Sequence, residues 1–221
     1  DDPLLSNSCN ITGYLHMLVA ARDAGVKSFV YAASSSTYGD SPELPKVEDK
    51  IGSPLSPYAV TKYVDELYAD VFNRCYGFSS VGLRYFNVYG PRQDPSSPYS
   101  GVISIFSERA EKGLPITIFG DGEQTRDFIY VGDLVGILVQ AVEAPQVEEG
   151  AINVGLNKAT TLKQMLEALS EVVGELPPIS YGPARPGDIR HSRADNSRLL
   201  QRFTLGDATP MNVGLAHLLG R

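Results

Sequence analysis

The sequence predicts an α/β protein built on a mainly parallel sheet. Segments with apolar residues at helical spacing alternate with short apolar runs along most of the 221 residues. That alternation is typical of parallel strands joined by helical crossovers. The composition, with 43% hydrophobic and 20% charged residues, is that of an ordinary globular protein with a sizeable core.

The first third of the chain supplies one helix and two buried strands. Apolar residues recur at helical spacing through residues 10–24, and Gly25 is suited to end that helix. Residues 27–33 and 80–86 are short apolar runs suited to buried parallel strands. Between them, residues 34–55 are polar and rich in proline, which predicts a loop.

A second helix is predicted over residues 56–76 from signals at both of its ends. Ser56 is a favourable N-cap, and Pro57 follows at the first helical turn, where its missing N–H costs little. Gly77 is placed to stop the helix.

The rest of the chain continues the alternation after a loop at residues 89–100, which is the best candidate for a boundary between two parts. Beyond residue 173 the pattern becomes less regular. The expected helices cover residues 102–112, 134–143 and 162–173, and the expected strands cover residues 116–119, 126–131 and 151–154.

The overall charge and the cysteine count argue against several functions. A net charge of −7 and a pI near 5.0 disfavour nucleic-acid binding, which needs a surplus of lysine and arginine on one face. Cys9 and Cys75 give neither a disulfide framework nor a metal-binding spacing, so we expect no metal and a reduced, cytoplasmic compartment. No run approaches the roughly 18 consecutive apolar residues of a membrane span, so we expect no membrane partner.

Tyr58 and Lys62 are the first candidates for chemistry. They lie four residues apart on a predicted helix and therefore share one face. A lysine ammonium beside a phenol favours the phenolate and lowers a tyrosine pKa from its usual value of about 10. Tyr58 could then act as a general base near neutral pH. The alternative is a half-buried tyrosine beside a solvated lysine, because this spacing is common by chance.

Three serines directly follow the first predicted strand. Ser34, Ser35 and Ser36 come at its carboxyl end, where parallel sheets bind ligands. A strand that ends in serines, followed 24 residues after Ser34 by a Tyr-x-x-x-Lys helix, resembles the Ser-Tyr-Lys triad of the short-chain dehydrogenase/reductase family. For the serines alone, a polar loop with helix caps is the alternative.

Four further motifs extend the resemblance to the extended branch of that family. They occur in the family's order and, with the triad, span most of the chain. They are Asn10-Ile11-Thr12-Gly13, Arg84-Tyr85-Phe86-Asn87, the segment from Gly120-Asp121-Gly122 to Arg126-Asp127-Phe128, and Arg185-Pro186-Gly187-Asp188.

The resemblance implies NAD as cofactor and a UDP-sugar as substrate, and it assigns roles to the matching positions. The catalytic residues are Ser34, Ser35, Tyr58 and Lys62. The NAD-binding residues are Asn10, Ala33, Tyr58, Lys62 and Tyr85. The residues that contact the substrate are Ser36, Asn87, Arg126, Arg185, Asp188 and Ser192.

Elementary chemistry supports several of these roles. Arg126 and Arg185 can each donate forked, charge-assisted hydrogen bonds to a diphosphate, although a surface arginine is the alternative for either one alone. Asn87 can donate its amide to a phosphate or sugar oxygen, or it can cap a strand end. Tyr85 can form a wall of the nicotinamide site, or it can be a core aromatic.

The loop after the first strand narrows the reaction within the family. The dehydratases have an Asp-Glu pair there that eliminates water, and the decarboxylases keep a Glu. This sequence has only hydroxyl residues from Ser34 to Thr37, so elimination lacks its acid and base. The resemblance therefore implies C4 epimerisation of a UDP-hexose through a 4-keto intermediate. Another NAD-dependent nucleotide-sugar epimerase or a dehydratase is the alternative.

Ser192 gives an expectation for the sugar. In the epimerases that the sequence resembles, the position four residues after Asp188 gates the sugar pocket, and a small residue there admits a 2-acetamido group. Here that position holds a serine. The resemblance therefore implies UDP-N-acetylglucosamine and UDP-N-acetylgalactosamine as the substrate pair.

The resemblance also implies an incomplete Rossmann-like, doubly wound parallel sheet with a small C-terminal α/β substrate-binding part. Residues 1–90, with 126–155 returning to them, would form the remaining part of the NAD-binding domain, and residues 91–221 would mainly bind the nucleotide sugar. The family's glycine-rich turn, which carries the pyrophosphate at a helix N-terminus, has no match in this sequence.

We therefore expect roughly the first hundred residues of the family's fold to be missing, including its glycine-rich turn. A truncated, non-catalytic nucleotide-sugar-binding fragment is the alternative to a working epimerase. By resemblance, the full-length form is expected to be a homodimer that pairs the helices at residues 10–24 and 58–76.

Overall fold

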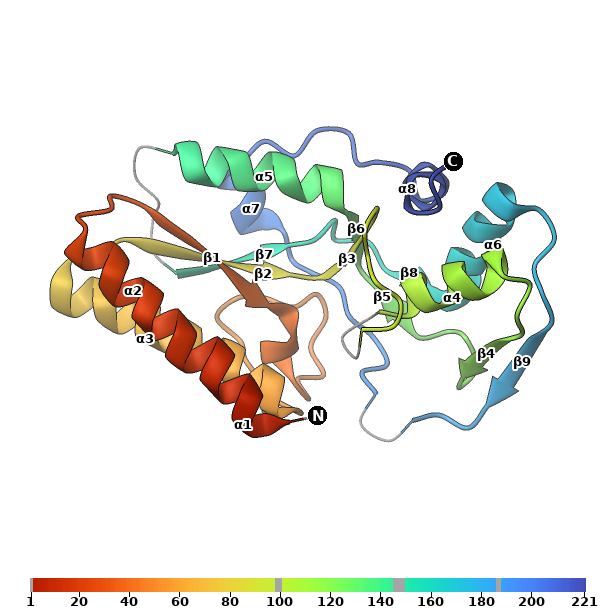
Figure 1. Cartoon of the computed structure of the whole chain (residues 1–221), viewed down its shortest axis with the longest axis horizontal. Coiled ribbons are helices and arrows are strands. Elements are labelled where there is room, and N and C mark those ends of the chain that lie inside the picture. Colours follow the sequence, from red (N-terminus) through yellow and green to blue (C-terminus); the bar gives the residue numbers. More distant parts are fainter. Residues whose placement is uncertain (1, 98–100, 145–149, 186–187) are drawn as a thin grey trace.

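The computed structural model describes residues 2–97, 101–144, 150–185 and 188–221. Figure 1 shows two lobes side by side: one built on a parallel sheet between helices, the other a smaller α/β unit that contains α4, α6 and α8. The predicted α/β class with parallel strands is therefore confirmed. Within the described residues, no helix is both long enough and apolar enough to cross a membrane.

The larger lobe is organised by a three-stranded parallel sheet in the order β1-β2-β7. Its strands are β1 (Phe29–Ser34), β2 (Ser80–Tyr85) and β7 (Gly150–Val154). Because β1 pairs with β2 in parallel, Ser34 lies directly opposite Tyr85 at the carboxyl end of the sheet. Two residues from separate motifs thus meet at the edge where parallel sheets bind ligands.

One face of this sheet is covered by the N-terminal helices and α3 (Figure 1). The predicted helix at residues 10–24 begins earlier than expected, because Asp2 accepts hydrogen bonds from two backbone N–H groups and caps a first turn. The chain is helical from there through α1 (Pro3–Ser6), a π-helical stretch (Asn7–Thr12) and α2 (Gly13–Asp23).

Helix α3 (Pro57–Tyr76) has the bounds that its capping residues predict. The Ser56 hydroxyl oxygen accepts a hydrogen bond from the Ala59 N–H at 3.1 Å. Gly77 ends the helix with φ at 62°, a left-handed conformation that glycine adopts without steric cost. Both predicted helix ends are confirmed.

The opposite face of the sheet is covered by α5 (Val131–Glu143) and α7 (Ser197–Arg202) (Figure 1). A cluster of buried apolar residues fills the space between them and the sheet. It contains Val81, Leu83, Ile129, Ile137, Ile152 and Leu199.

The smaller lobe is an α/β unit with its own core. Strands β4 (Ile116–Phe119) and β9 (Ile179–Gly182) pair in parallel. Helices α4 (Val102–Glu111), α6 (Leu162–Val173) and α8 (Met211–Leu218) pack with this pair around buried apolar residues that include Ile116, Ile118, Met165, Leu169 and Leu215. The expectation of a less regular tail after residue 173 was wrong for β9, α7 and α8.

Short strand pairs connect the two lobes. Strand β3 (Asn87–Tyr89) pairs in parallel with β6 (Phe128–Tyr130), and β5 (Thr125–Arg126) pairs antiparallel with β8 (Thr160–Thr161). The single strand predicted at residues 126–131 was therefore wrong, because it divides at Asp127.

Asp127 divides the predicted strand because its carboxylate bonds to backbone outside the sheet. The carboxylate accepts hydrogen bonds from the backbone N–H of Leu156 at 2.9 Å and from that of Ala194 at 3.0 Å. These bonds tie the chain after β7 and the C-terminal segment to the connection between the lobes.

A buried polar network crosses the middle of the larger lobe. The Arg84 guanidinium, 3% exposed, donates to both carboxylate oxygens of Glu66 on α3, at 2.9 and 2.6 Å. It also donates to the Tyr38 hydroxyl at 3.0 Å and to the Glu48 carbonyl at 2.8 Å. The Tyr38 hydroxyl in turn donates to the Asn153 side-chain oxygen at 2.6 Å. One arginine on β2 thus joins the helix α3, the turn after β1 and the strand β7.

We predict that Glu66→Gln destabilises the fold by about 3–5 kcal/mol, because it leaves the buried Arg84 charge without its counter-charge. Urea unfolding at neutral pH measures this change. Asp70→Asn is the matched control, because Asp70 lies on the same helix and its ion pair with Arg74 is exposed. The control substitution should lower the free energy of unfolding by about 1 kcal/mol or less. Equal losses in the two variants would contradict a structural role for the buried pair.

Candidate active site

The serine turn after β1 is held in one conformation by its own hydrogen bonds. The Ser34 hydroxyl oxygen accepts from the Ser36 N–H at 3.2 Å and from the Ser36 hydroxyl at 2.9 Å. Residues Ser35–Tyr38 form a 3-10 turn inside the predicted loop. Gly39 closes it at φ 50°, where a Cβ atom would lie 1.8 Å from the Ser53 carbonyl oxygen. Only glycine fits there, so the half-buried serines are fixed relative to the sheet.

Lys62 joins α3 to the same end of β1. Its ammonium donates to the Ala32 carbonyl at 3.1 Å, two residues before Ser34. Tyr58 lies four residues earlier on α3, half-buried and on the same helix face. The structure therefore places the Tyr-x-x-x-Lys helix against the strand that carries the serine turn.

Asn10 supports this helix from the neighbouring one. Its amide donates to the Thr61 hydroxyl at 3.0 Å, and that hydroxyl donates to the Tyr58 carbonyl at 2.8 Å. Asn10 is thus linked to the turn of α3 that carries Tyr58. Ala33, 3% exposed, has its side chain in the core beside Tyr31.

The end of β2 continues this part of the site. Tyr85 is partly exposed beside Ser34, and burial raises the pKa of its phenol. The adjacent Phe86 is a core residue, because it is buried against Tyr38 and Ala194.

A second part of the site is a cavity of about 620 Å³ in the smaller lobe. Its walls bring together four residues that the sequence motifs single out, namely Asn87, Arg126, Arg185 and Asp188. Residues 186 and 187 of the fourth motif lie outside the described residues.

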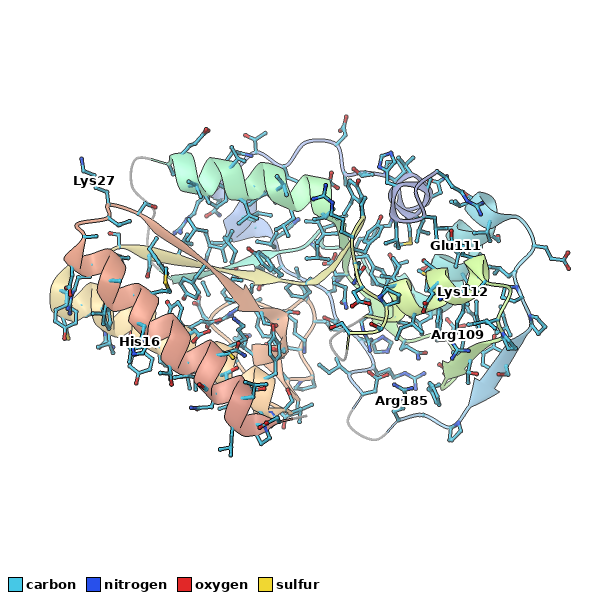
Figure 2. All side chains as sticks on the ribbon, viewed as in Figure 1. His16, Lys27, Arg109, Glu111, Lys112 and Arg185 are labelled. Atoms are coloured by element: carbon cyan, nitrogen blue, oxygen red, sulfur yellow. The ribbon has the colours of Figure 1, made fainter. Side chains whose placement is uncertain are left out.

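Arginines and aromatic rings line this cavity together. The Arg185 guanidinium lies over the Phe119 ring, 3.9 Å from its centroid. Arg109, on α4, also lines the cavity, and Figure 2 shows it and Arg185 in the same lobe. The sequence motifs did not reveal Arg109, because a single arginine near the end of a helix has no distinguishing pattern.

Arg126 is held in place by its neighbours. Its guanidinium donates to the Asp188 carboxylate at 2.7 Å and to the Thr125 and Arg190 carbonyls at 2.9 and 3.3 Å. Burial lowers its pKa, and Asp188 acts in the opposite direction. An arginine never loses its proton under ordinary conditions, so Arg126 stays charged, and Asp188 pairs with that charge in the cavity wall.

Ser192 sits beside this cavity. Its N–H donates to the Thr125 carbonyl at 3.1 Å, next to Arg126 in the chain. Among the described residues, the cavity lining includes neither Ser192 nor the serines after β1. The structure therefore groups the candidate residues into two parts, one at the end of β1 and one in the smaller lobe.

Sequence reasoning missed the residues that hold these parts in place. Arg84 belongs to a recognised motif, but its buried contacts with Tyr38 and Glu66 join residues far apart in sequence, and no local pattern shows that they converge. Asp65 was also missed: its carboxylate oxygen Oδ2 lies 3.5 Å from the Lys62 ammonium. A carboxylate three residues after the motif lysine was the available signal.

Comparisons with known proteins identify the family of this chain. Residues 1–155 match the model of the NAD dependent epimerase/dehydratase family. The chain belongs to this family of enzymes.

Particular relatives are UDP-sugar 4-epimerases. The chain is 38% identical over 199 residues to a UDP-glucose 4-epimerase of Mycolicibacterium smegmatis, covering 90% of this chain and 63% of that protein. The chain thus spans less than two thirds of that relative's length.

Two solved structures share the fold closely. A UDP-N-acetylglucosamine 4-epimerase from Methanobrevibacter ruminantium, in complex with UDP-N-acetylmuramic acid, superposes with a TM-score of 0.94 at 38% identity, covering 99% of this chain and 70% of that one. A UDP-glucose 4-epimerase from Thermus thermophilus, in complex with NAD, gives a TM-score of 0.87 at 36% identity, with coverage of 99% and 71%.

Proposed function

We propose that the protein is an NAD-dependent UDP-sugar 4-epimerase that interconverts UDP-N-acetylglucosamine and UDP-N-acetylgalactosamine through a 4-keto intermediate. The observation that carries this proposal is the contact between Lys62 and the Ala32 carbonyl. This contact joins the helix that carries Tyr58 and Lys62 to the strand that ends in the serine turn. The chain also belongs to the epimerase/dehydratase family.

The residues around the end of β1 fit NAD. Tyr58, Lys62 and Tyr85 supply a hydroxyl, an ammonium and an aromatic ring near one edge of the sheet, and Ala33 contributes its backbone. Asn10 lies beside them and bonds to Thr61 on α3. NAD, when bound, supplies an acceptor and donor of hydride for the sugar C4 carbon. A solved structure at 36% identity contains NAD, which supports this assignment.

Tyr58 and Ser34 move the proton of the sugar C4 hydroxyl in this proposal. The Ser34 oxygen already accepts two hydrogen bonds from Ser36, which leaves its own O–H as a donor toward a ligand. Ser34 then orients the C4 oxygen, with Ser35 beside it, while the Tyr58 phenolate takes the proton and later returns it. Lys62 keeps positive charge near the phenolate.

The cavity in the smaller lobe holds the UDP part of the substrate. Arg126 and Arg185 donate to the diphosphate oxygens, because a guanidinium fork matches two phosphate oxygens at once. Asn87 and Ser36 contact the phosphate and sugar, and Asp188 contacts the ribose or holds Arg126 as it does here.

A dimer is part of the proposal. The outer face of the N-terminal helices and α3 carries exposed apolar side chains, which favour a protein contact over solvent. These residues are Leu4, Leu5, Met17, Val60, Leu67 and Val71. A second copy that presents the same face would cover them in a homodimer.

The protein with NAD bound tests the catalytic assignment. We predict that Tyr58→Phe lowers kcat for UDP-N-acetylglucosamine by at least about 10²-fold, the usual scale for loss of a general base, while NAD stays bound. Tyr63→Phe is the control, because Tyr63 lies on the same helix outside the motif. Near-normal turnover in Tyr58→Phe would remove Tyr58 from the mechanism, and accumulation of NADH would indicate a dehydrogenase instead.

The identity of the sugar rests on Ser192, because the relatives include both UDP-glucose and UDP-N-acetylglucosamine epimerases. We predict that Ser192→Tyr lowers kcat/KM for the N-acetylated pair at least about 10-fold more than for UDP-glucose and UDP-galactose, because a phenol ring takes the space of an acetamido group. Competition assays with both pairs measure the preference.

Ser192→Ala is the matched control for this substitution. It removes the hydroxyl without adding bulk and should leave the preference unchanged. Equal loss on both substrate pairs in Ser192→Tyr, or no loss on either, would show that Ser192 does not gate the sugar pocket.

A further inference from the structure

Asp65 is a buried carboxylate on α3, one helical turn after the motif lysine Lys62. It lies on α3 three residues after Lys62 and is 1% exposed. Its Oδ2 atom lies 3.5 Å from the Lys62 ammonium, and its Oδ1 atom has no hydrogen-bond partner among the described residues. Burial of a half-satisfied carboxylate is costly, so packing alone does not explain why an aspartate occupies this position.

Lys62 is the cation that pairs with Asp65, because the other described groups around Asp65 are neutral or are paired with each other. From α2, Tyr14 faces it with a buried hydroxyl, and from β1, Tyr31 faces it too. Burial, above all, raises the pKa of both phenols, so they stay neutral.

The other charged groups nearby are engaged with each other. Glu66, next to Asp65 on α3, is bonded to Arg84 of β2 through both carboxylate oxygens. Burial raises the pKa of Asp65 itself to about 6, and Lys62 opposes that rise. Asp65 therefore carries its negative charge at neutral and alkaline pH, close to the lysine ammonium.

Lys62 has two acceptors that fix its position. The Ala32 carbonyl lies at 3.1 Å and the Asp65 carboxylate at 3.5 Å. Residues 58, 62 and 65 fall on one face of the helix, because their spacings are four and three. The negative charge of Asp65 therefore changes the electrostatic potential at Tyr58 directly, and it also acts on Tyr58 by holding the Lys62 ammonium in place.

We propose that Asp65 is a positioning residue of the active site, which holds the Lys62 ammonium from behind and partly cancels its positive charge at Tyr58. This inference rests on the proposed roles of Tyr58 and Lys62. It adds a residue that sets how strongly the lysine favours the phenolate, and therefore the pH range in which the base works.

Asp65→Asn tests the proposal, because it keeps the side-chain shape and removes the charge. Without the negative charge, Lys62 favours the phenolate more strongly. We predict that the midpoint of the acidic limb of the kcat–pH profile moves down by about half to one pH unit, as expected for a charge roughly 10 Å away along a helix. Asp70→Asn, which removes an exposed carboxylate from the same helix, should leave the midpoint in place.

A second readout does not depend on turnover. Ultraviolet difference titration of tyrosinate, with and without Tyr58→Phe, isolates the ionisation of the Tyr58 phenol in the wild-type and Asp65→Asn backgrounds. The proposal predicts a shift to lower pH in the Asp65→Asn background. This titration stays informative if the protein proves not to be an epimerase, so the two proposals can fail separately.

An unchanged ionisation midpoint in both measurements, even with a lower kcat, would overturn the proposal and leave Asp65 a purely structural residue. A shift to higher pH would overturn it as well. Should Asp65→Asn not fold, Asp65→Ser removes the same charge and carries the same expectation.

Discussion

The buried ion pair between Arg84 and Glu66 is the constraint on which the arrangement of the site depends. A guanidinium inside a sheet is tolerated only when its charge is paired and its donors are bonded. Here the pairing partner is on α3, and the remaining donors reach the Tyr38 hydroxyl and the Glu48 carbonyl. Satisfying one charge therefore fixes α3, the end of the serine turn and the loop after it relative to β2.

The same network reaches the C-terminal segment near Asp195. Asn153 accepts from Tyr38 and donates to the carbonyls of Lys46 and Asp195, so the segment that follows Ser192 is tied to the serine turn. Asp127 acts similarly between the lobes, through its bonds to Leu156 and Ala194. In the proposed function, the sugar lies at one edge of the sheet and the nucleotide lies in the other lobe. These buried polar links provide a rigid connection between the two parts.

The features that the sequence predicted well are those set by local chemistry. The ends of α3 follow from Ser56 and Gly77, and the parallel sheet follows from short apolar runs between helices. Strand β9 escaped prediction because its residues are mostly exposed and show no alternation, and α7 is too short to establish a helical period. The candidate residues were found through motifs, whereas the Arg84 network and Asp65 depend on tertiary contacts that no local pattern contains. The roles assigned to the candidate residues stay predictions.

In the proposed function, this site oxidises and reduces the sugar at C4 without exchanging the C4 hydrogen with solvent. The most direct measurement uses UDP-N-acetylglucosamine carrying deuterium at C4, converted by the NAD-bound protein in ordinary water. We expect the C4-epimeric product to keep its deuterium at C4, because that hydrogen leaves and returns as hydride within one site. Product in which solvent hydrogen replaces the deuterium at C4 would rule out hydride transfer, because it would show that epimerisation proceeds by removal of the C4 hydrogen as a proton.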